Sequence, residues 1–387
     1  MFSERTNWNF VANRLSEALA AHRAGGKPLL DLTVSNPTEC GFQYEEQEIR
    51  HALANAAALR YEPDPRGMRS ARAAVAGYYA GRGAQIGRDD IVLTTSTSEA
   101  YSFAFRLLCN PGDDILIPAP SYPLFDFLAD IHDVRLARYP LFYDHGWQID
   151  FHALEKAISG RTRAVLVVHP NNPTGHFTRR AEATQLREIC ATHEIALIAD
   201  EVFLDFSLAN ETPQSFAANA GALTFTTSGL SKISGLPQMK AAWLVVNGPP
   251  EQKAQALLRL EVIADTYLSM NAPIQLAMPV FLEQRHGFQT QWMDRARKNL
   301  AELDRQLAAQ HACSRLKVEG GWYAVIRLPA TRDDEEFALD LLRAKNVCIH
   351  PGHFYDFPGN GYLVVSLITP EGDFAEGAIR LLSHANE

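Results

Sequence analysis

Between residues 90 and 250, short runs of apolar residues alternate with stretches that have the spacing of amphipathic helices. The runs are continuously apolar, which is typical of strands buried on both faces of a sheet. Strands that alternate with helices form a mostly parallel sheet covered by helices on either side. The runs expected to be strands are 91–95, 114–117, 134–137, 164–168, 195–199, 223–226 and 241–246. The pattern therefore predicts an α/β fold with a mostly parallel seven-stranded sheet flanked by helices.

The rest of the chain has a different pattern of predicted helices and strands. At 387 residues the chain exceeds the usual size of a single core, so a second domain is expected. A long helical region from about 251 to 310 leads into a tail in which short strands and helices alternate. We expect a large domain of residues 46–281 and a smaller α+β domain formed by residues 1–45 together with 282–387.

Charge and hydropathy argue against nucleic-acid-binding and membrane proteins. With 36 basic and 45 acidic residues, the formal net charge is −9, which leaves no basic face for nucleic acid. The longest apolar runs, such as Ile195 to Ala199, are far shorter than the roughly 20 residues of a membrane span. The N-terminus has no apolar segment typical of a signal peptide. We therefore expect a cytoplasmic protein whose partners are small molecules.

The cysteines argue against disulfides and structural zinc. They stand at positions 40, 109, 190, 313 and 348, are odd in number and include no Cys-x-x-Cys pair. Cys348-x-His350-x-x-His353 is the one spacing that could hold a metal. Pro351-Gly352 stands in its middle and no fourth ligand is near in sequence, so a polar loop is favoured and no metal is expected.

Polar residues gather where the predicted strands end, and open α/β sheets bind ligands at such ends. Thr94-Thr-Ser-Thr-Ser-Glu-Ala100 follows the first strand and opens a helix, so its hydroxyls and backbone N–H groups could hold a phosphate. Serine and threonine are also ordinary helix N-caps, and this stretch alone does not separate the two interpretations.

An amide, a carboxylate and a lysine follow later strands. His169-Pro-Asn-Asn172-Pro-Thr-Gly175 follows the fourth strand, and a turn explains its glycine and prolines but not its two asparagines. Asp200 and Glu201 follow the fifth strand, where a buried carboxylate is costly unless it meets a cation. Lys232 lies in a short polar stretch between the sixth and seventh strands.

Taken together, these groups are the ones needed to hold pyridoxal phosphate. In such a site the lysine forms a Schiff base with the cofactor, and the aspartate keeps the ring nitrogen protonated so that the ring acts as an electron sink. The asparagine bonds the ring hydroxyl. Lys232, Asp200 and Asn172 are the candidates for these three roles.

These stretches resemble a known family. Ser231-Lys232-x-x-Gly235-Leu-Pro237, Asn171-Asn-Pro-Thr-Gly175 and Asp200-Glu-Val are similar to the signature of class I/II aminotransferases, pyridoxal-phosphate enzymes of fold type I, and the resemblance covers nearly the whole chain. It implies that Lys232 also shuttles the proton of the reaction. It implies further cofactor contacts from the ring-stacking Tyr122, from the phosphate-binding Ser96, Thr97, Ser98 and Ser231 or Ser228, and from Tyr61 of a neighbouring subunit. A homodimer with shared active sites would follow.

Two positions near the cofactor depart from the family pattern. The tyrosine of Asp-Glu-x-Tyr is Phe203 here, so a donor to the ring oxygen is missing, and we expect the pKa of the Schiff base to rise. The arginine expected after Gly-Leu-Pro is Lys240, which keeps the positive charge on the phosphate but gives up bidentate geometry.

The third departure concerns the substrate. Enzymes of this family hold the substrate α-carboxylate with an arginine in a late strand, and Val364 occupies the place of that arginine. A change of register does not restore it, because no arginine occurs between Arg343 and Arg380. Either the substrate has no carboxylate there or another cation takes over. The candidates for that cation are Arg327, His350 and His353.

We interpret the sequence as an aminotransferase that moves an amino group between an amino acid or amine and a 2-oxo acid, with atypical recognition at Val364. Asn36 stands where the family's N-terminal loop crosses the substrate, although a simple turn explains it equally. A lyase, decarboxylase or cyclase of the same fold would use the same lysine, and fold does not decide between them. A non-enzymatic regulator is disfavoured, because only one short amphipathic segment precedes the enzyme-like region.

Overall fold

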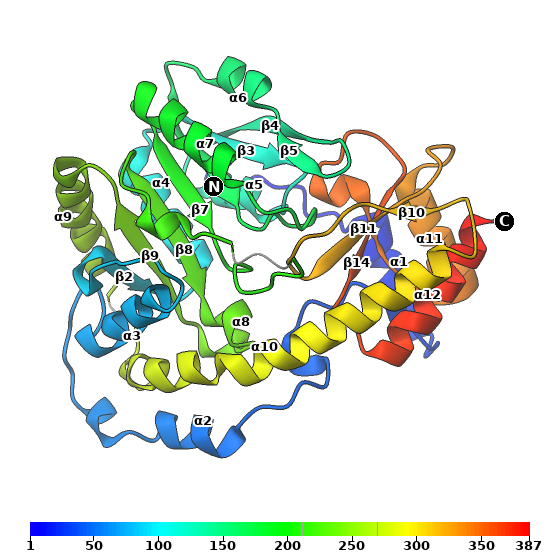
Figure 1. Cartoon of the computed structure of the whole chain (residues 1–387), viewed down its shortest axis with the longest axis horizontal. Helices are drawn as coiled ribbons and strands as arrows, with labels where there is room; N and C mark the ends of the chain where they lie inside the picture. The colour runs from blue at the N-terminus through cyan, green and yellow to red at the C-terminus, as the bar shows by residue number, and fades with distance from the viewer. Residues whose placement is uncertain (210–212, 269) are drawn as a thin grey trace.

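The computed structural model describes residues 1–209, 213–268 and 270–387. Within these residues the largest sheet has eight strands in the order β2-β9-β8-β7-β6-β3-β4-β5 (Figure 1). Its strands are β2 (Ile91–Thr94), β3 (Asp114–Ala119), β4 (Arg135–Tyr143), β5 (Trp147–Ile149), β6 (Thr162–Val168), β7 (Ala196–Asp200), β8 (Thr224–Gly229) and β9 (Ala242–Asn247).

Seven of these strands coincide with the predicted runs, so the predicted α/β fold with a mostly parallel sheet is confirmed. The addition is β5, which pairs antiparallel with β4 at the edge. Strands β8, β7, β6, β3 and β4 are parallel, whereas β9 is antiparallel to both of its neighbours. Because β9 reverses the direction, β2 runs the same way as β8. The carboxyl ends of β2, β8, β7, β6 and β3 therefore lie along one edge of the sheet.

Helices cover both faces of this sheet (Figure 1). On one face α4 (Thr97–Leu108), α5 (Leu124–Ile131) and α9 (Pro250–Tyr267) share a core with alternate strand residues such as Ala164 and Leu166. The intervening residues, such as Val165 and Val167, face the other side, where α3 (Arg69–Ala80), α6 (Phe151–Ala157), α7 (Arg180–Thr192) and α8 (Leu230–Ile233) pack. Burial on both faces explains why the strands are continuously apolar.

A smaller group of strands and helices follows the predicted α+β pattern. An antiparallel sheet in the order β10-β11-β14-β13 and a parallel pair β1-β12 pack with three helices. These elements are β1 (Leu30–Asp31), β10 (Ser314–Arg315), β11 (Tyr323–Arg327), β12 (Val347–Cys348), β13 (His350–Pro351), β14 (Tyr362–Ser366), α1 (Arg14–Ala24), α11 (Asp334–Lys345) and α12 (Glu371–Ala385).

One long helix, α10 (Ala272–Leu307), joins the two groups of elements. It packs against α2 (Glu46–Leu53) and α3 toward its start and against α12 toward its end (Figure 1). The domain boundary predicted between residues 281 and 282 lies inside this helix. The division into domains therefore stays a prediction, with a single helix crossing it.

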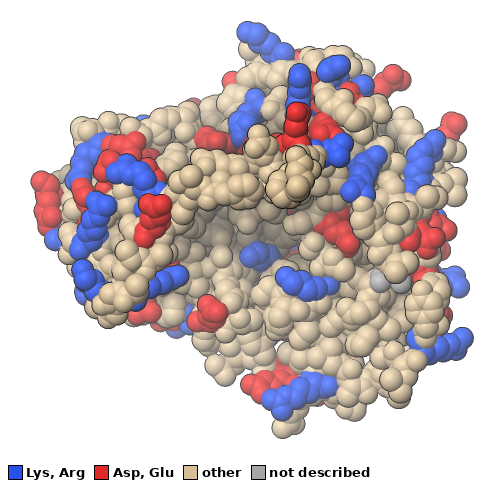
Figure 2. Space-filling view, turned by 180° about the vertical axis from the view of Figure 1, so that it is seen from behind, with Lys and Arg blue, Asp and Glu red and all other residues tan. Residues whose placement is uncertain are grey.

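The surface carries acidic and basic side chains interspersed, and the face shown in Figure 2 is hollowed near its centre. Across the described ranges, none of the helices combines the length and apolar character needed to cross a lipid bilayer.

A buried ion pair and its hydrogen bonds connect α3 and the long helix α10 to the loop after β7. Arg82, just past α3, pairs with Asp205, whose side chain is 3% exposed. Tyr78 donates a hydrogen bond to Oδ1 of Asp205 (3.0 Å), and the Gln289 amide of α10 donates to Oδ2 (2.7 Å). The same amide donates to the carbonyl of Ile233 (2.9 Å). Asp205 thus holds α3, α10 and, through Gln289, the short helix α8 in one arrangement.

Replacing Asp205 with alanine should lower the free energy of unfolding by about 3 to 5 kcal/mol, because the buried Arg82 guanidinium loses its counter-charge. Urea unfolding followed by circular dichroism measures the loss. The control is the double replacement Arg82→Met with Asp205→Leu, which removes both charges and should cost much less. A loss below about 1 kcal/mol in the single variant would contradict the role of the ion pair.

Candidate active site

The polar residues predicted to form a site come together at the edge where the parallel strands end. Asp200 is the last residue of β7, Asn172 lies in the loop after β6, and Lys232 lies in α8 directly after β8. Tyr122 follows β3, and Ser96 caps the helix that follows β2. Sheet topology therefore brings together residues that are up to 136 positions apart in the sequence, from Ser96 to Lys232.

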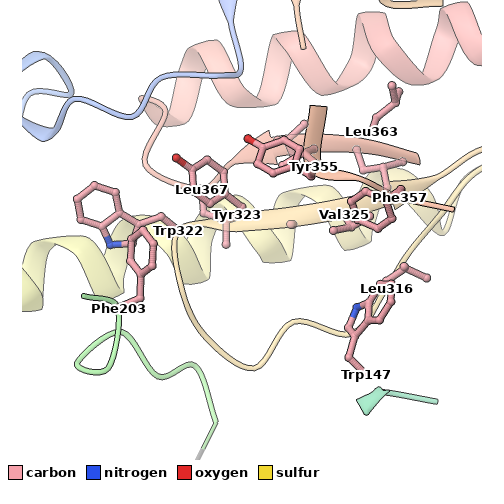
Figure 3. Packing of buried hydrophobic residues seen from close by; sticks show 14 of the residues in the cluster. Trp147, Phe203, Leu316, Trp322, Tyr323, Val325, Tyr355, Phe357, Leu363 and Leu367 are labelled. Atoms are coloured by element: carbon pink, nitrogen blue, oxygen red, sulfur yellow. The ribbon is translucent and has the colours of Figure 1, made fainter. Parts of the chain in front are cut away.

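Lys232 lies among aromatic rings. Its Nζ is 4.6 Å from the ring centroid of Trp322 and 5.7 Å from that of Phe203. The two rings pack against each other with centroids 5.5 Å apart (Figure 3). Burial lowers the pKa of the Lys232 ammonium to about 8, while the attraction of Asp200 opposes this shift. The amine is therefore partly neutral near pH 8, as a nucleophile or proton carrier requires.

Asp200 is buried but well supplied with hydrogen-bond donors. The hydroxyl of Tyr101 donates to Oδ2 at 2.6 Å, and the backbone N–H of Val202 donates to Oδ1 at 2.9 Å. Burial raises the pKa of the Asp200 carboxyl, and these two hydrogen bonds together with Lys232 act to lower it. Lys232 is the cation that acts on the pKa of this carboxyl, although no ion pair joins the two side chains among the described residues.

Tyr101 is a site residue that the sequence analysis missed. It lies in α4 with its ring against Phe125, where its type and spacing resemble those of a core aromatic. The available signal was its hydroxyl, because a buried phenol usually needs a hydrogen-bond partner. Trp322 was missed for the same reason, since its aromatic character alone predicts a core position.

Glu201 directly follows Asp200 in the chain and is fully buried. Its carboxylate accepts hydrogen bonds from the hydroxyl of Ser215 (2.7 Å) and the backbone N–H of Phe216. Burial raises the pKa of the Glu201 carboxyl to about 7. The hydroxyl of Ser228 donates to the backbone carbonyl of Glu201 (3.1 Å), so it is already engaged and is a poor candidate for a phosphate donor.

The stretch after β2 contains both a cap and free hydroxyls. The side chain of Ser96 accepts a hydrogen bond from the backbone N–H of Glu99 (3.1 Å) and so caps α4. The hydroxyls of Thr97 and Ser98, in the first turn, make no hydrogen bond to any other described residue, and neither does that of Ser231. Lys240, in a left-handed conformation (φ 49°) just before β9, is exposed and has no ion pair among the described residues.

The donor set fits pyridoxal phosphate. Oδ1 of Asn172 is buried and has no hydrogen-bond partner in the described part of the chain, and the same is true of the hydroxyls of Ser121 and Thr226. Buried polar atoms without partners are uncommon in native proteins and indicate a partner from outside the chain. An amine, a carboxylate, an amide and free hydroxyls at a helix N-terminus match the aldehyde, ring nitrogen, ring oxygen and phosphate of this cofactor.

Three further predicted residues have distinct surroundings. The Tyr122 ring is 44% exposed, and its phenol pKa is raised by burial and by Asp200, which places it near that carboxylate. Tyr61 is 80% exposed. Asn36 accepts hydrogen bonds from the backbone N–H (3.2 Å) and hydroxyl (2.8 Å) of Thr38. These bonds form the simple turn that the sequence also allowed at this position.

Val364 is 1% exposed in the middle of β14, paired with Val325 of β11 and with His350 of β13. Of the three candidate cations, His350 is therefore the one beside it. The exposed Arg327 is the last residue of β11, and its guanidinium lies over the ring of Tyr362 at 5.5 Å.

The third candidate, His353, is exposed and packs on Phe354, with ring centroids 4.7 Å apart. Cys348, the first residue of the Cys-x-His-x-x-His spacing that includes His353, lies in β12 beside β1. No group of three or more histidine, cysteine, aspartate or glutamate residues suited to a metal ion occurs within the described residues.

Comparisons with known proteins agree with this arrangement. The sequence profile described as aminotransferase class I and II matches residues 27–372. The chain is 28% identical over 368 residues to an alanine aminotransferase of Mycobacterium tuberculosis, covering 92% of this chain and 86% of the relative. It is 28% identical over 358 residues to a glutamate-pyruvate aminotransferase of Escherichia coli, covering 89% and 87%. The solved structure of an alanine aminotransferase from Pyrococcus furiosus matches the whole length of both chains with a TM-score of 0.91 at 23% identity, which shows the shared fold. The chain therefore belongs to the class I and II aminotransferase family.

Proposed function

We propose that this aminotransferase uses pyridoxal phosphate bound as a Schiff base to Lys232, and that it moves an amino group between an amino acid or amine and a 2-oxo acid. The observation that carries the proposal is the Lys232 amine, with its pKa lowered to about 8 beside the buried Asp200. The reaction class is supported by the family and by relatives named as alanine and glutamate-pyruvate aminotransferases.

When bound, pyridoxal phosphate supplies an electron sink for the carbon that carries the amino group. Asp200 would hold a proton on the ring nitrogen, and Tyr101 favours the ionised form of that carboxyl by donating a hydrogen bond to it. Asn172, whose side-chain amide oxygen has no partner among the described residues, would turn this amide toward the cofactor and donate an N–H to the ring oxygen. Tyr122, close to Asp200, would stack on the ring.

The phosphate would be held by the start of α4 and by the loop around the lysine. Thr97, Ser98 and Ser231 offer free hydroxyls, and Ser96 fixes the helix start by capping it. Lys240 would add a positive charge. A helix N-terminus favours an anion through its backbone N–H groups and dipole.

The proton transfer falls to Nζ of Lys232. A lysine amine with a pKa of about 8 can take up a proton and return it near neutral pH, which an ordinary lysine does poorly. The rings of Trp322 and Phe203 lie against the amine and cover part of it. These residues bind, orient and shield the reacting atoms, and the fold holds them at the ends of rigid strands.

Purified protein with added pyridoxal phosphate should show the absorbance band of a lysine-bound cofactor, and the Lys232→Ala variant should lose it. Lys240→Ala is the matched control from the same loop. It should keep the band but release the cofactor more readily, because only a phosphate contact is lost. A band that persists in Lys232→Ala would overturn the proposal.

The rate at which cofactor-free protein captures pyridoxal phosphate should rise with pH through about 8. Only the neutral amine attacks the aldehyde, so capture is slow below the pKa of Lys232 and levels off above it. Replacing Asp200 with asparagine should move the midpoint to lower pH, since the carboxylate raises this pKa. Stopped-flow absorbance measures the profile. A midpoint near 10.5, the ordinary pKa of lysine, would show that burial does not act as described.

The proposal includes a homodimer in which Tyr61 of one subunit reaches the phosphate of the other. It is supported by the 80% exposure of Tyr61 and by the neighbouring Leu59, which is 93% exposed. Exposed apolar residues of this size often mark an interface.

Mixing two inactive variants tests the shared site. In a hybrid of Tyr61→Ala and Lys232→Ala subunits, one of the two sites contains both native residues. After subunit exchange the mixture should recover up to about a quarter of the native rate, since half of the dimers are hybrids with one intact site each. Each variant alone is the control. A mixture no more active than the variants, despite confirmed hybrids, would contradict a shared site.

A further inference from the structure

Polar aromatic side chains surround Val364. Residues paired across neighbouring strands point to the same face of a sheet, so Val364, Val325 and His350 share one face. Tyr323, two residues before Val325, points the same way. Nδ1 of His350 is hydrogen-bonded to the hydroxyl of Tyr355 at 2.9 Å. We refer to Tyr323, Tyr355 and His350 as the phenol cluster.

The phenol cluster faces the edge of the large sheet where the proposed cofactor site lies. The backbone N–H of Ser121 donates to the carbonyl of Tyr355 at 2.8 Å. Tyr122 acts on the pKa of the phenols of both Tyr323 and Tyr355, so the three rings lie close together. In Figure 3 the hydroxyls of Tyr323 and Tyr355 point to the same side, and Trp322, which contacts Lys232, lies next to them.

Each member of the cluster is neutral near pH 7. Burial raises the pKa of the phenols of Tyr323 and Tyr355 and lowers the pKa of the His350 imidazole. The one charged residue that acts on His350 is Asp31, an anion. Within the described residues no lysine or arginine contributes to any of these pKa shifts.

The arginines in the neighbourhood are engaged elsewhere. Arg138 is paired with Asp126 and Asp356, and Arg23 with Asp31. Arg327 stands two residues along β11 from Val325, the partner of Val364, but it is exposed and its guanidinium lies over the ring of Tyr362. Of the three replacement cations considered from the sequence, His350 is therefore the one beside Val364, and its imidazole belongs to the phenol cluster.

A carboxylate brought to the phenol cluster would lose its hydration without meeting a lysine or arginine. An uncharged hydroxyl or amide could accept a hydrogen bond from a phenol and donate one to the imidazole without that penalty. We propose that the phenol cluster takes the place of the carboxylate-binding arginine, and that the substrate carries an uncharged hydrogen-bonding group there, as in an amino alcohol or amino amide. This inference rests on the proposed function, because it assumes the cofactor at Lys232.

The substrate class is tested with donors that differ in one group. L-alanine, L-alaninamide, L-alaninol and isopropylamine are each added to the cofactor-loaded protein, and the change in cofactor absorbance gives the rate and affinity of the half-reaction. For L-alaninamide and L-alaninol, the ratio of the maximal rate to the apparent dissociation constant should exceed that for L-alanine by about tenfold or more. A site built for hydrogen bonds to an uncharged group discriminates strongly against substrates without one. Isopropylamine should be weaker than L-alaninol. A preference of the native protein for L-alanine over L-alaninamide and L-alaninol would overturn the inference.

Single-residue variants test which side chains determine the preference among these amino donors. Val364→Arg should reverse the preference toward L-alanine. Tyr355→Phe, which keeps the ring and removes only the hydroxyl, should abolish the advantage of L-alaninol over isopropylamine. Tyr362→Phe is the matched control, a phenol of β14 that packs on Phe357, and it should keep that advantage. Loss of the L-alaninol advantage in the control but not in Tyr355→Phe would contradict the assignment.

A second measurement separates this inference from the proposed function. Calorimetric titration with isobutyramide and isobutyrate, which are unreactive and nearly isosteric, reports binding without any reaction. The amide should bind more tightly than the carboxylate to the native protein, and Tyr355→Phe should narrow the difference. If the absorbance band of Lys232-bound cofactor is absent, the proposed function fails. The relative affinities for isobutyramide and isobutyrate still test whether the phenol cluster prefers an uncharged group. Tighter binding of isobutyrate to the native protein would overturn the inference about the phenol cluster. This test uses the native protein and does not depend on whether Val364→Arg folds.

Discussion

The electrostatic attraction between Lys232 and Asp200, beside the rings of Trp322 and Phe203, is the interaction on which the rest of the site depends. Desolvation lowers the pKa of the lysine, and the carboxylate limits that shift, so the amine remains usable near neutral pH. Both residues stand at the ends of neighbouring parallel strands, β7 and β8. Support comes from outside the sheet as well, since Tyr101 of α4 holds the carboxylate and Gln289 of α10 holds the carbonyl beside the lysine.

The departures from the family pattern share a physical consequence. Phe203 stands where a phenol is expected and packs within reach of the lysine amine, and Val364 stands where a guanidinium is expected and is fully buried. In the proposed site, each would put an apolar side chain where a polar or charged one is expected. Such a site would lack a donor and a cation, while the phenols of β11 and of the loop after β13 remain. This combination favours an uncharged substituent on the substrate.

Much of this arrangement could be predicted from the sequence, because it follows from local patterns. Continuous apolar runs predicted the parallel sheet, and the residues directly after each run, such as Asp200, lie at its functional edge. What could not be predicted depends on contacts between distant segments. The three-residue β5 is too short to produce a pattern, the pairing of His350 with Val364 depends on register, and Tyr101 and Trp322 have the residue type of core positions. The helix α10 also crosses the domain boundary predicted between residues 281 and 282.

The most direct test of the central claim is to fix the cofactor on the protein and identify its attachment. Protein loaded with pyridoxal phosphate is treated with borohydride, which converts the lysine–cofactor bond to a stable one, and digested for mass spectrometry. The account predicts that the added mass lies on the peptide containing Lys232, at that residue. Labelling of another lysine, such as Lys240, or no label at all would contradict it.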